Sequence, residues 1–277
     1  MITLVGTPIG NLGDLSPRVA SVLADADIVA AEDTRRARTL LSHLGLRKKL
    51  VSYHRANERQ RGPDLISAAQ SGQRVVLVSD AGMPGVSDPG EALVRRAVDA
   101  GVAVDVVPGP SAALVALVVS GLRTDRFVFE GFLPRRGGER SRRLAEVASE
   151  QRTVVLFEAP HRVRATLSDL AEVCGGDRRV AVARELTKLY EDVWRGELRD
   201  AVAAVGEPRG EYAIVLGGAE PSASAVDFGH EVDARVAAGQ SARDAAAAVA
   251  EERGASKSSV YRHWLAHRAA PGRPVIS

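Results

Sequence analysis

Cysteine, aromatic residues and long apolar runs are all scarce in this chain of 277 residues. The single cysteine, Cys174, excludes an internal disulfide framework and a zinc site built from several cysteines. No apolar run approaches the length of about 18 residues that a transmembrane helix needs. The N-terminal Met1-Ile2-Thr3-Leu4-Val5 resembles a strand rather than a signal peptide. These absences predict a soluble, cytoplasmic protein without a membrane partner.

Several motifs of common enzyme classes are also missing. The chain has no Walker A sequence, no G-x-S-x-G and no H-E-x-x-H. The turn at residues 6–14 is rich in glycine, but its glycines are not spaced as G-x-G-x-x-G and Pro8 lies among them. The sequence therefore disfavours phosphoryl transfer and a Rossmann-type NAD site, and we predict no metal site.

Basic residues, in contrast, are concentrated in three runs although the net charge is only +2. Residues 35–61 hold nine Lys or Arg and one acid, residues 131–143 hold five Arg and one acid, and residues 257–273 hold four basic residues and no acid. One such run is usual on a solvated surface. Three runs in a nearly neutral chain favour a polyanionic partner, with nucleic acid as the leading candidate.

Apolar runs and helical patterns alternate through the first 110 residues. Strands are predicted at 2–5, 28–31, 49–52, 75–79 and 102–107, and helices at 17–24, 36–44, 62–70, 91–100 and 112–119. This alternation is typical of an α/β fold with a mostly parallel sheet covered on both faces.

A second block follows with a different pattern. Strands are predicted at 126–132, 153–158, 179–185, 190–196 and 211–216, and helices at 138–149, 162–173 and 198–205. The connection between 179–185 and 190–196 is too short for a crossover, so this pair should be antiparallel and the sheet mixed. We predict domains at 1–112 and 113–217, a linker at 218–226 and a helical extension at 227–277. Helices at 241–253 and 257–266 have helix-turn-helix proportions, although a plain helical hairpin explains them equally well.

Loops at 6–14, 79–90 and 107–112 follow strands and should meet at one edge of the parallel sheet, where such sheets bind ligands. The 79–90 loop has three glycines, two prolines and no phosphate-binding lysine, which favours a neutral or zwitterionic ligand. Glu32 and Asp33 end another strand. They could contact a ligand, or they could cap the following helix.

These motifs together resemble the tetrapyrrole-methylase-like superfamily of S-adenosylmethionine-dependent methyltransferases over residues 1–217. Within it, the chain is similar to the branch that 2′-O-methylates the ribose of a cytidine in the decoding region of 16S RNA in the small ribosomal subunit. The resemblance implies two α/β domains with the cofactor in the cleft between them, a helical C-terminal extension and a homodimer. The motifs that carry it are Gly6-Thr7-Pro8-Ile9-Gly10-Asn11, Ala31-Glu32-Asp33-Thr34-Arg35, Ser52-Tyr53-His54, residues 79–90, residues 108–112 and Phe157-Glu158-Ala159-Pro160-His161-Arg162.

The resemblance also implies which residues contact S-adenosylmethionine. The tetrapyrrole branch typically has Gly-Asp-Pro where this chain has its 79–90 loop, so the resemblance implies the role of the loop but not its individual contacts. Asp80 is a cofactor contact or a cap of its own loop. The positions implied are Pro8, Ser79, Asp80, Ala81, Gly82, Gly85, Val86, Ser111, Ala112, Phe157 and Glu158.

Methyl transfer to a hydroxyl calls for a general base, because the hydroxyl is a poor nucleophile until its proton leaves. The sequence offers five candidates without choosing among them: Asp33, His54, Glu158, Glu185 and Lys188. Tyr53, His54 and Phe132 are the aromatic groups available for stacking on RNA bases. The expected phosphate contacts are Arg35, Arg36, Arg38, Arg55, Arg135, Arg136, Arg140, Arg142 and Arg143.

Two other functions fit parts of the sequence. One is a methyltransferase of the same superfamily acting on a tetrapyrrole or a modified histidine of a translation factor, although neither acceptor needs three basic runs. The other is a DNA-binding regulator whose α/β body senses a metabolite and whose 241–266 helices read DNA.

Overall fold

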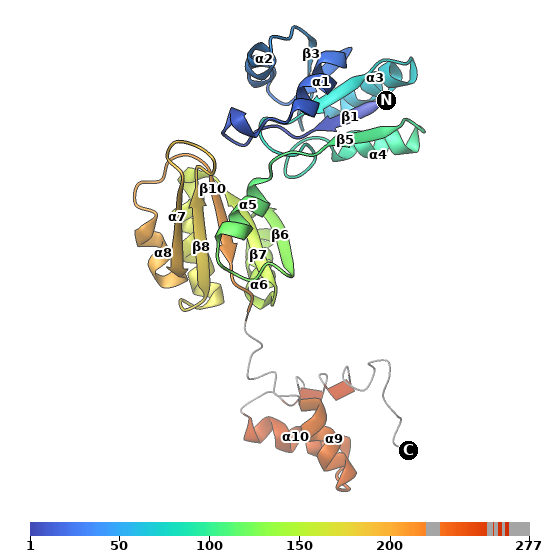
Figure 1. The fold of residues 1–277 in the computed structure, drawn as a ribbon. Coiled ribbons are helices and arrows are strands. Elements are labelled where there is room, and N and C mark those ends of the chain that lie inside the picture. The colour runs from blue at the N-terminus through green and yellow to red at the C-terminus, as the bar shows by residue number, and fades with distance from the viewer. Residues whose placement is uncertain (220–227, 254–256, 258–259, 262–263, 266–277) are drawn as a thin grey trace. The chain divides into compact units, whose positions relative to one another are not determined.

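The computed structural model describes residues 1–219, 228–253, 257, 260–261 and 264–265 (Figure 1). The chain divides into two compact units, Met1–Ala219 and Glu220–Ser277. The first unit contains two sheets, and the second contains helices. In the described residues, no helix has both the length and the apolar character needed to cross a membrane.

The first sheet is entirely parallel, with strand order β3-β2-β4-β1-β5. Its strands are β1 (Ile2–Val5), β2 (Ile28–Ala31), β3 (Lys49–Ser52), β4 (Val75–Val78) and β5 (Val104–Val107). Every residue of β1, β2 and β4 is buried, as their continuous apolar sequences predict for inner parallel strands. The predicted parallel α/β arrangement is confirmed.

Helices cover both faces of this sheet. On one face, α1 (Pro17–Asp25) and α2 (Thr34–His43) pack through Val19, Leu23 and Leu41. On the other face, α3 (Glu58–Gln70) and α4 (Glu91–Asp99) pack through Leu65 and Leu93. A short 3-10 helix (Leu12–Asp14) follows β1. The strands are four residues long, so their carboxyl ends lie close together at the edge where the loops leave.

The second sheet is mixed, as predicted, in the order β6-β7-β10-β8-β9. Strands β6 and β7 are parallel, and β10 is antiparallel to both β7 and β8. The pair β8 and β9 is antiparallel, which confirms the inference from their short connection. The strands are β6 (Phe127–Phe132), β7 (Thr153–Glu158), β8 (Arg179–Arg184), β9 (Asp192–Glu197) and β10 (Tyr212–Leu216).

Two layers of helix enclose this mixed sheet. One face packs against α6 (Gly138–Ser149), α7 (Pro160–Cys174) and α8 (Leu198–Ala204) around Leu156, Leu167 and Ile214. The other face packs against α5 (Ala112–Val119), where Ala113, Ala116 and Leu117 contact the sheet. Ile9 belongs to the same apolar cluster, so the loop after β1 packs against the face of the second sheet that α5 covers.

The predicted boundaries are accurate to about one or two residues at most ends, and one helix differs more. Helix α3 begins at Glu58 and not at residue 62, because the amides of Asn57 and Glu58 already donate to the His54 carbonyl. Pro63 is accommodated inside this helix. The division into domains 1–112 and 113–217 remains a prediction, since residues 1–219 pack as one unit.

The second unit contains α9 (Phe228–Ala237) and α10 (Ala242–Glu252), both within the predicted helical extension, although the sequence analysis assigned no individual helix to residues 228–237. Ser241 caps α10 by accepting a hydrogen bond from the Asp244 amide. Val232, Val249 and Trp264 belong to one buried cluster. Most of the predicted linker, and much of the helix predicted at 257–266, lie outside the described residues.

Candidate functional site

The loops that follow β1, β4 and β5 meet at one edge of the parallel sheet, as the sequence predicts. Thr7 and Gly82 exchange two backbone hydrogen bonds, of 2.9 and 3.0 Å, which join the first two loops. Gly6 and Gly109 join the first and third loops by direct backbone contact. These contacts give the edge a fixed backbone wall.

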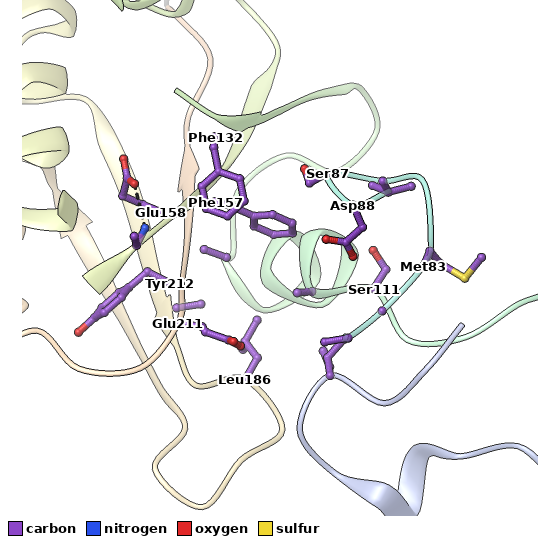
Figure 2. Close-up of a pocket in the computed structure, with 18 of the residues that line it drawn as sticks. Met83, Ser87, Asp88, Ser111, Phe132, Phe157, Glu158, Leu186, Glu211 and Tyr212 are labelled. Atoms are coloured by element: carbon purple, nitrogen blue, oxygen red, sulfur yellow. Dashed lines mark hydrogen bonds between the residues drawn. The ribbon is translucent and has the colours of Figure 1, made fainter. Parts of the chain in front are cut away.

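A cavity of about 340 Å³ lies between this wall and the second sheet (Figure 2). Its volume is within the range of small-molecule sites, about 300–1,000 Å³. It is lined by Ile9, Ala81, Gly82, Met83, Val86, Ser87, Asp88, Ser111, Ala112, Phe132, Phe157, Glu158, Ala159, Pro160, Ala183, Leu186, Glu211, Tyr212 and Ala213.

The second sheet supplies an aromatic wall. Phe157, on β7, packs edge-on against Phe129 with ring centroids 5.0 Å apart and against Phe132 at 5.8 Å. This packing fixes the Phe157 ring in the cavity, where Figure 2 shows it facing the loop that carries Asp88. A flat apolar group of a ligand can therefore be held against Phe157.

Ionisable side chains in the cavity are all acidic. Among the described residues that line it, Asp88, Glu158 and Glu211 carry carboxylates and none is Lys or Arg. Glu158 is paired with Arg162 and Glu211 with Lys188, so among the described residues Asp88 is the one of these three carboxylates without an ion-pair partner. A carboxylate that is partly shielded from water in this way favours a ligand with positive charge.

Asp88 is the acid whose ionisation is most altered. Burial of its side chain, reinforced by repulsion from Glu32 and Asp80, raises the pKa of Asp88 to about 7. Ser79 and Arg55 pull this pKa in the opposite direction but do not outweigh burial. Burial and repulsion from Asp80 also raise the pKa of Glu32. An acid with a pKa near neutrality inside a cavity is a candidate for proton transfer.

Glu158 is fully engaged by its own helix and loop. Its Oε2 accepts a 2.6 Å hydrogen bond from the Thr166 hydroxyl, and its Oε1 accepts a 2.8 Å bond from the Ala159 amide. Arg162 lies 3.3 Å from Oε1. Although Glu158 lines the cavity, its side chain is only 1% exposed. The arrangement anchors α7 to the end of β7.

Glu185 and Lys188 form an ion-paired turn between β8 and β9, together with Glu211. The Lys188 Nζ lies 2.7 Å from Glu185 Oε1 and 2.9 Å from Glu211 Oε2. Burial alone would lower the pKa of Lys188, but these two hydrogen bonds raise it. Burial alone would raise the pKa of Glu185, but the bond from Lys188 and the Glu211 amide lower it. Both groups are therefore charged at neutral pH.

Asp33 and His54 lie outside the cavity lining. Asp33 caps α2 by accepting a 2.8 Å hydrogen bond from the Arg35 amide. The hydrogen bonds from Arg35 lower the pKa of Asp33 to about 2. His54 is half-buried, and its backbone begins the turn that leads into α3. Of the two interpretations of Asp33, helix capping is the one that these contacts support.

Seven of the eleven predicted cofactor residues line the cavity: Ala81, Gly82, Val86, Ser111, Ala112, Phe157 and Glu158. Pro8, Ser79, Asp80 and Gly85 do not. Asp80 instead accepts a 2.9 Å hydrogen bond from the Asp33 amide and lies 3.6 Å from Arg36, so it ties the ends of β2 and β4 together. The roles of all eleven residues remain predictions.

The sequence did not single out Asp88, Ser87, Met83, Leu186, Glu211 or Tyr212 as lining residues. Asp88 lies in the loop that the sequence emphasised, and its place beside Ser87 and two prolines could have marked it. Glu211 precedes β10 and Tyr212 begins it, and this strand lies beside the cavity because it is the central strand of the mixed sheet. No local signal indicates that position.

The predicted RNA-contacting arginines differ in their exposure to solvent and in the partners that their side chains bind. Arg35, Arg38, Arg135, Arg136 and Arg142 are exposed, and Arg36 is exposed beside Asp80. Arg55 is exposed and donates a 2.9 Å hydrogen bond to the Ser87 carbonyl, beside the cavity.

Arg140 and Arg143 are each held by two side chains of the fold, although only Arg140 is largely buried and the Arg143 side chain is 48% exposed. The Arg140 side chain is only 12% exposed and binds Asp169, Thr166 and the Pro134 carbonyl. Arg143 pairs with Glu130 and Glu146. The expectation that Tyr53 stacks on RNA is wrong, because its side chain is completely buried in the parallel-sheet core.

The fold and the cavity define a class: an α/β protein of two sheets with a cavity of small-molecule size at the carboxyl edge of its parallel sheet. Residues 1–202 match the family described as "Tetrapyrrole (Corrin/Porphyrin) Methylases". The chain therefore belongs to the tetrapyrrole methylase family.

Known relatives cover the chain almost completely. One from Mycobacterium tuberculosis, "Ribosomal RNA small subunit methyltransferase I", is 45% identical over 99% of this chain and 98% of its own length. A Synechocystis relative with the same description is 44% identical over 95% and 96%. The solved uroporphyrin-III C-methyltransferase of Thermus thermophilus, complexed with S-adenyl homocysteine, is 22% identical and superposes with a TM-score of 0.56. The superposed region spans 78% of this chain and 96% of the chain in that structure.

Proposed function

We propose that this protein is an S-adenosylmethionine-dependent methyltransferase that 2′-O-methylates the ribose of a cytidine in the decoding region of 16S RNA. The observation that carries the proposal is the match over almost the whole chain, at 44–45% identity, to relatives described as ribosomal RNA small subunit methyltransferases. The specific nucleoside and its 2′-hydroxyl follow from the motif resemblance in residues 1–217.

The cavity suits S-adenosylmethionine, which would supply an electrophilic methyl group on a positively charged sulfur. Phe157 offers an apolar face for the adenine ring, and the backbone of the 79–90 loop offers polar groups to the methionine portion. The Asp88 carboxylate can compensate the positive charge, and none of the described lining residues is Lys or Arg. Ala81, Gly82, Ser111 and Ala112 are small enough to let a ligand approach the backbone closely.

Exposed arginines beside the cavity support an RNA acceptor. Arg55 lies against Ser87 at the cavity lining, and Arg35 and Arg36 open the helix that follows β2. A second exposed group, Arg135 and Arg136, follows β6, whose last residue Phe132 also lines the cavity. Phosphates bound to these arginines would position a ribose at the cavity without reading its sequence.

The protein's own contribution to the reaction is alignment and proton removal. The backbone wall joined by Thr7 and Gly82 holds the methyl donor in one place, so that a bound ribose hydroxyl can face the methyl carbon opposite the sulfur. Such alignment supplies a large part of the rate acceleration. A group in the cavity that accepts the hydroxyl proton supplies a further part.

The test is a methyl-transfer assay with three acceptors: purified small subunits, free 16S RNA and precorrin. We expect incorporation into the RNA of small subunits, and nucleoside digestion should yield 2′-O-methylcytidine. Mass mapping of ribosomal RNA from cells lacking the protein should show the loss of one 2′-O-methyl group. Incorporation into precorrin alone would show that the acceptor is a tetrapyrrole, as the family description also allows.

We further propose that the protein acts as a cytoplasmic homodimer, in line with the same resemblance. Exposed apolar side chains on α5, Leu114 at 50% and Val118 at 72%, are compatible with a partner. Light scattering of the purified protein should give twice the mass of 29.3 kDa. A monomeric mass at micromolar concentration would contradict this assignment.

A further inference from the structure

None of the five predicted bases is both inside the cavity and available to accept a proton. Asp33 and His54 do not line the cavity, and Asp33 is held ionised by Arg35. Glu158 has both oxygens engaged by its own surroundings. Glu185 and Lys188 are paired with each other, and the Lys188 ammonium is already protonated.

Asp88 meets both conditions. It lines the cavity from the loop after β4, and Figure 2 shows its carboxylate directed into the cavity towards the Phe157 ring. The side chain is half-buried, so the carboxylate is shielded from bulk water yet still borders the ligand space. Ser111, the residue that precedes α5, also lines the cavity.

The backbone next to Asp88 is held in an unusual conformation. Ser87 has φ +64, one of three positive φ values of non-glycine residues in the described part of the chain. The Arg55 guanidinium binds the Ser87 carbonyl at 2.9 Å and so stabilises this conformation. The other two non-glycine residues with positive φ, Glu185 and Thr187, flank the lining residue Leu186. Strained backbone of this kind is concentrated at sites where side-chain placement matters.

The charges around Asp88 come from several elements. Glu32 follows β2, Asp80 follows β4, and Arg55 follows β3. Across the cavity, Glu158 and Glu211 also border the ligand space. The neighbouring carboxylates of Glu32 and Asp80 disfavour the ionised form of Asp88, and a positively charged methyl donor would favour it.

We propose that Asp88 is the general base that accepts the 2′-hydroxyl proton of the ribose; this rests on the function proposed above. The ribose oxygen forms a bond to the methyl carbon, the bond between that carbon and sulfur breaks with its electron pair passing to sulfur, and the hydroxyl proton passes to an Asp88 oxygen. Asp88 then releases the proton to solvent. Arg55 is the positioning residue, because it fixes Ser87 and can also bind the phosphate of the same nucleotide.

The experiment is Asp88→Asn in the full-length protein, with small subunits as acceptor. The amide has the size of the carboxylate but cannot take the proton. We expect kcat to fall by about 10²–10⁴-fold, the usual contribution of a general base. The Kd for S-adenosylmethionine, measured by calorimetry, should change less than about threefold. Retained binding would also show that the variant is folded.

The pH profile supplies the second readout. Wild-type kcat/KM should rise with pH through an inflection close to the pKa of about 7 of Asp88 in the free enzyme. Asp88→Glu should keep part of the activity and move the inflection, whereas the residual activity of Asp88→Asn should lose it. Asp99→Asn, an exposed aspartate of α4, is the matched control and should leave rate and profile unchanged.

Three results would overturn the assignment. Full activity of Asp88→Asn would show that another group accepts the proton. Loss of S-adenosylmethionine binding by this variant, with its fold intact by circular dichroism, would make Asp88 a cofactor contact instead. A wild-type protein that is inactive on small subunits would overturn the proposed function itself. This outcome is distinguishable from failure of the Asp88 assignment, because it is measured without any variant.

Discussion

Gly6 and Gly109 lie in direct backbone contact. A Cβ atom on Gly109 would be 2.7 Å from the carbonyl carbon of Gly6, and one on Gly6 would be 2.7 Å from the backbone of Gly109. Neither glycine has a positive φ, so the requirement for glycine here is steric. The contact joins the ends of β1 and β5, immediately behind the cavity wall.

Gly109→Ala should therefore be destabilising even though it adds only one methyl group. The backbone of Gly6 cannot move aside as a flexible side chain can, so we expect a loss of about 1–3 kcal/mol in the free energy of unfolding, as for overpacked cores. Chemical denaturation measures it. Gly138→Ala is the control, because a Cβ atom there meets nothing within 4 Å. Equal stabilities of the two variants would contradict the steric requirement.

Thr166→Val tests whether Glu158 is an anchor of α7. The Thr166 hydroxyl donates to Glu158 and accepts from Arg140, and Thr166 is 1% exposed. Removing it leaves two buried charged groups short of a partner, for which we expect a cost of about 1–3 kcal/mol. The exposed Thr39→Val should change stability by less than about 0.5 kcal/mol. A neutral Thr166→Val would show that water or a rearrangement replaces the hydroxyl.

The arginines of residues 131–143 should separate into two functions. Arg135→Ala and Arg136→Ala together should weaken binding to small subunits and reduce the slope of log K against log salt by roughly 0.7–0.9 for each lost phosphate contact. Both side chains are exposed, so stability should not change. Binding can be followed by filtration at several salt concentrations.

Arg140→Ala is predicted to do the opposite of those two substitutions. It removes the partner of Asp169 and Thr166 inside the fold, so the midpoint of thermal unfolding should fall while the salt slope of RNA binding stays constant. An unchanged midpoint combined with a reduced salt slope would make Arg140 a phosphate contact, as the sequence first suggested.

Asp88→Asn should also change stability in a pH-dependent way. The Asp88 pKa is about 7 in the folded protein against a model-peptide value of 3.8. The proton thus stabilises the folded state at low pH, and this stabilisation is lost as pH rises towards 7. The ligand-free variant should match the wild type near pH 4 and be more stable near pH 8, by at least about 2 °C in Tm. A Tm difference independent of pH would contradict a raised pKa.

The fold could be predicted well because its signals are local. The β-branched sequence Val75-Val76-Leu77-Val78 forms β4 in the interior of the parallel sheet. The short connection between residues 185 and 190 required an antiparallel pair, which the structure contains as β8 and β9. The helix predicted at 62–70 begins at Glu58 in the structure, because the amides of Asn57 and Glu58 donate to the His54 carbonyl and extend the helix by one turn ahead of Gly62.

The site could be predicted only in part, for a physical reason. Loops from consecutive parallel strands meet at one edge, so Ala81, Gly82 and Ser111 could be placed at the cavity. Asp88 and Glu211 are 123 positions apart in the chain, and only the order of the mixed sheet places both on the cavity lining. The ionisation of Asp88 depends on burial and on neighbours from other strand ends, which no local sequence pattern records.

The acidic, arginine-free lining of the cavity has a consequence for turnover. Methyl transfer turns a sulfonium cation into a neutral thioether, so the spent donor loses its attraction to Asp88, the lining carboxylate that is not paired with a basic side chain in the described structure. The cavity therefore binds the neutral spent donor more weakly than the cationic fresh donor, so electrostatics favours replacement of the one by the other. The same lining that attracts the reactive cofactor thus relieves product inhibition without any moving part.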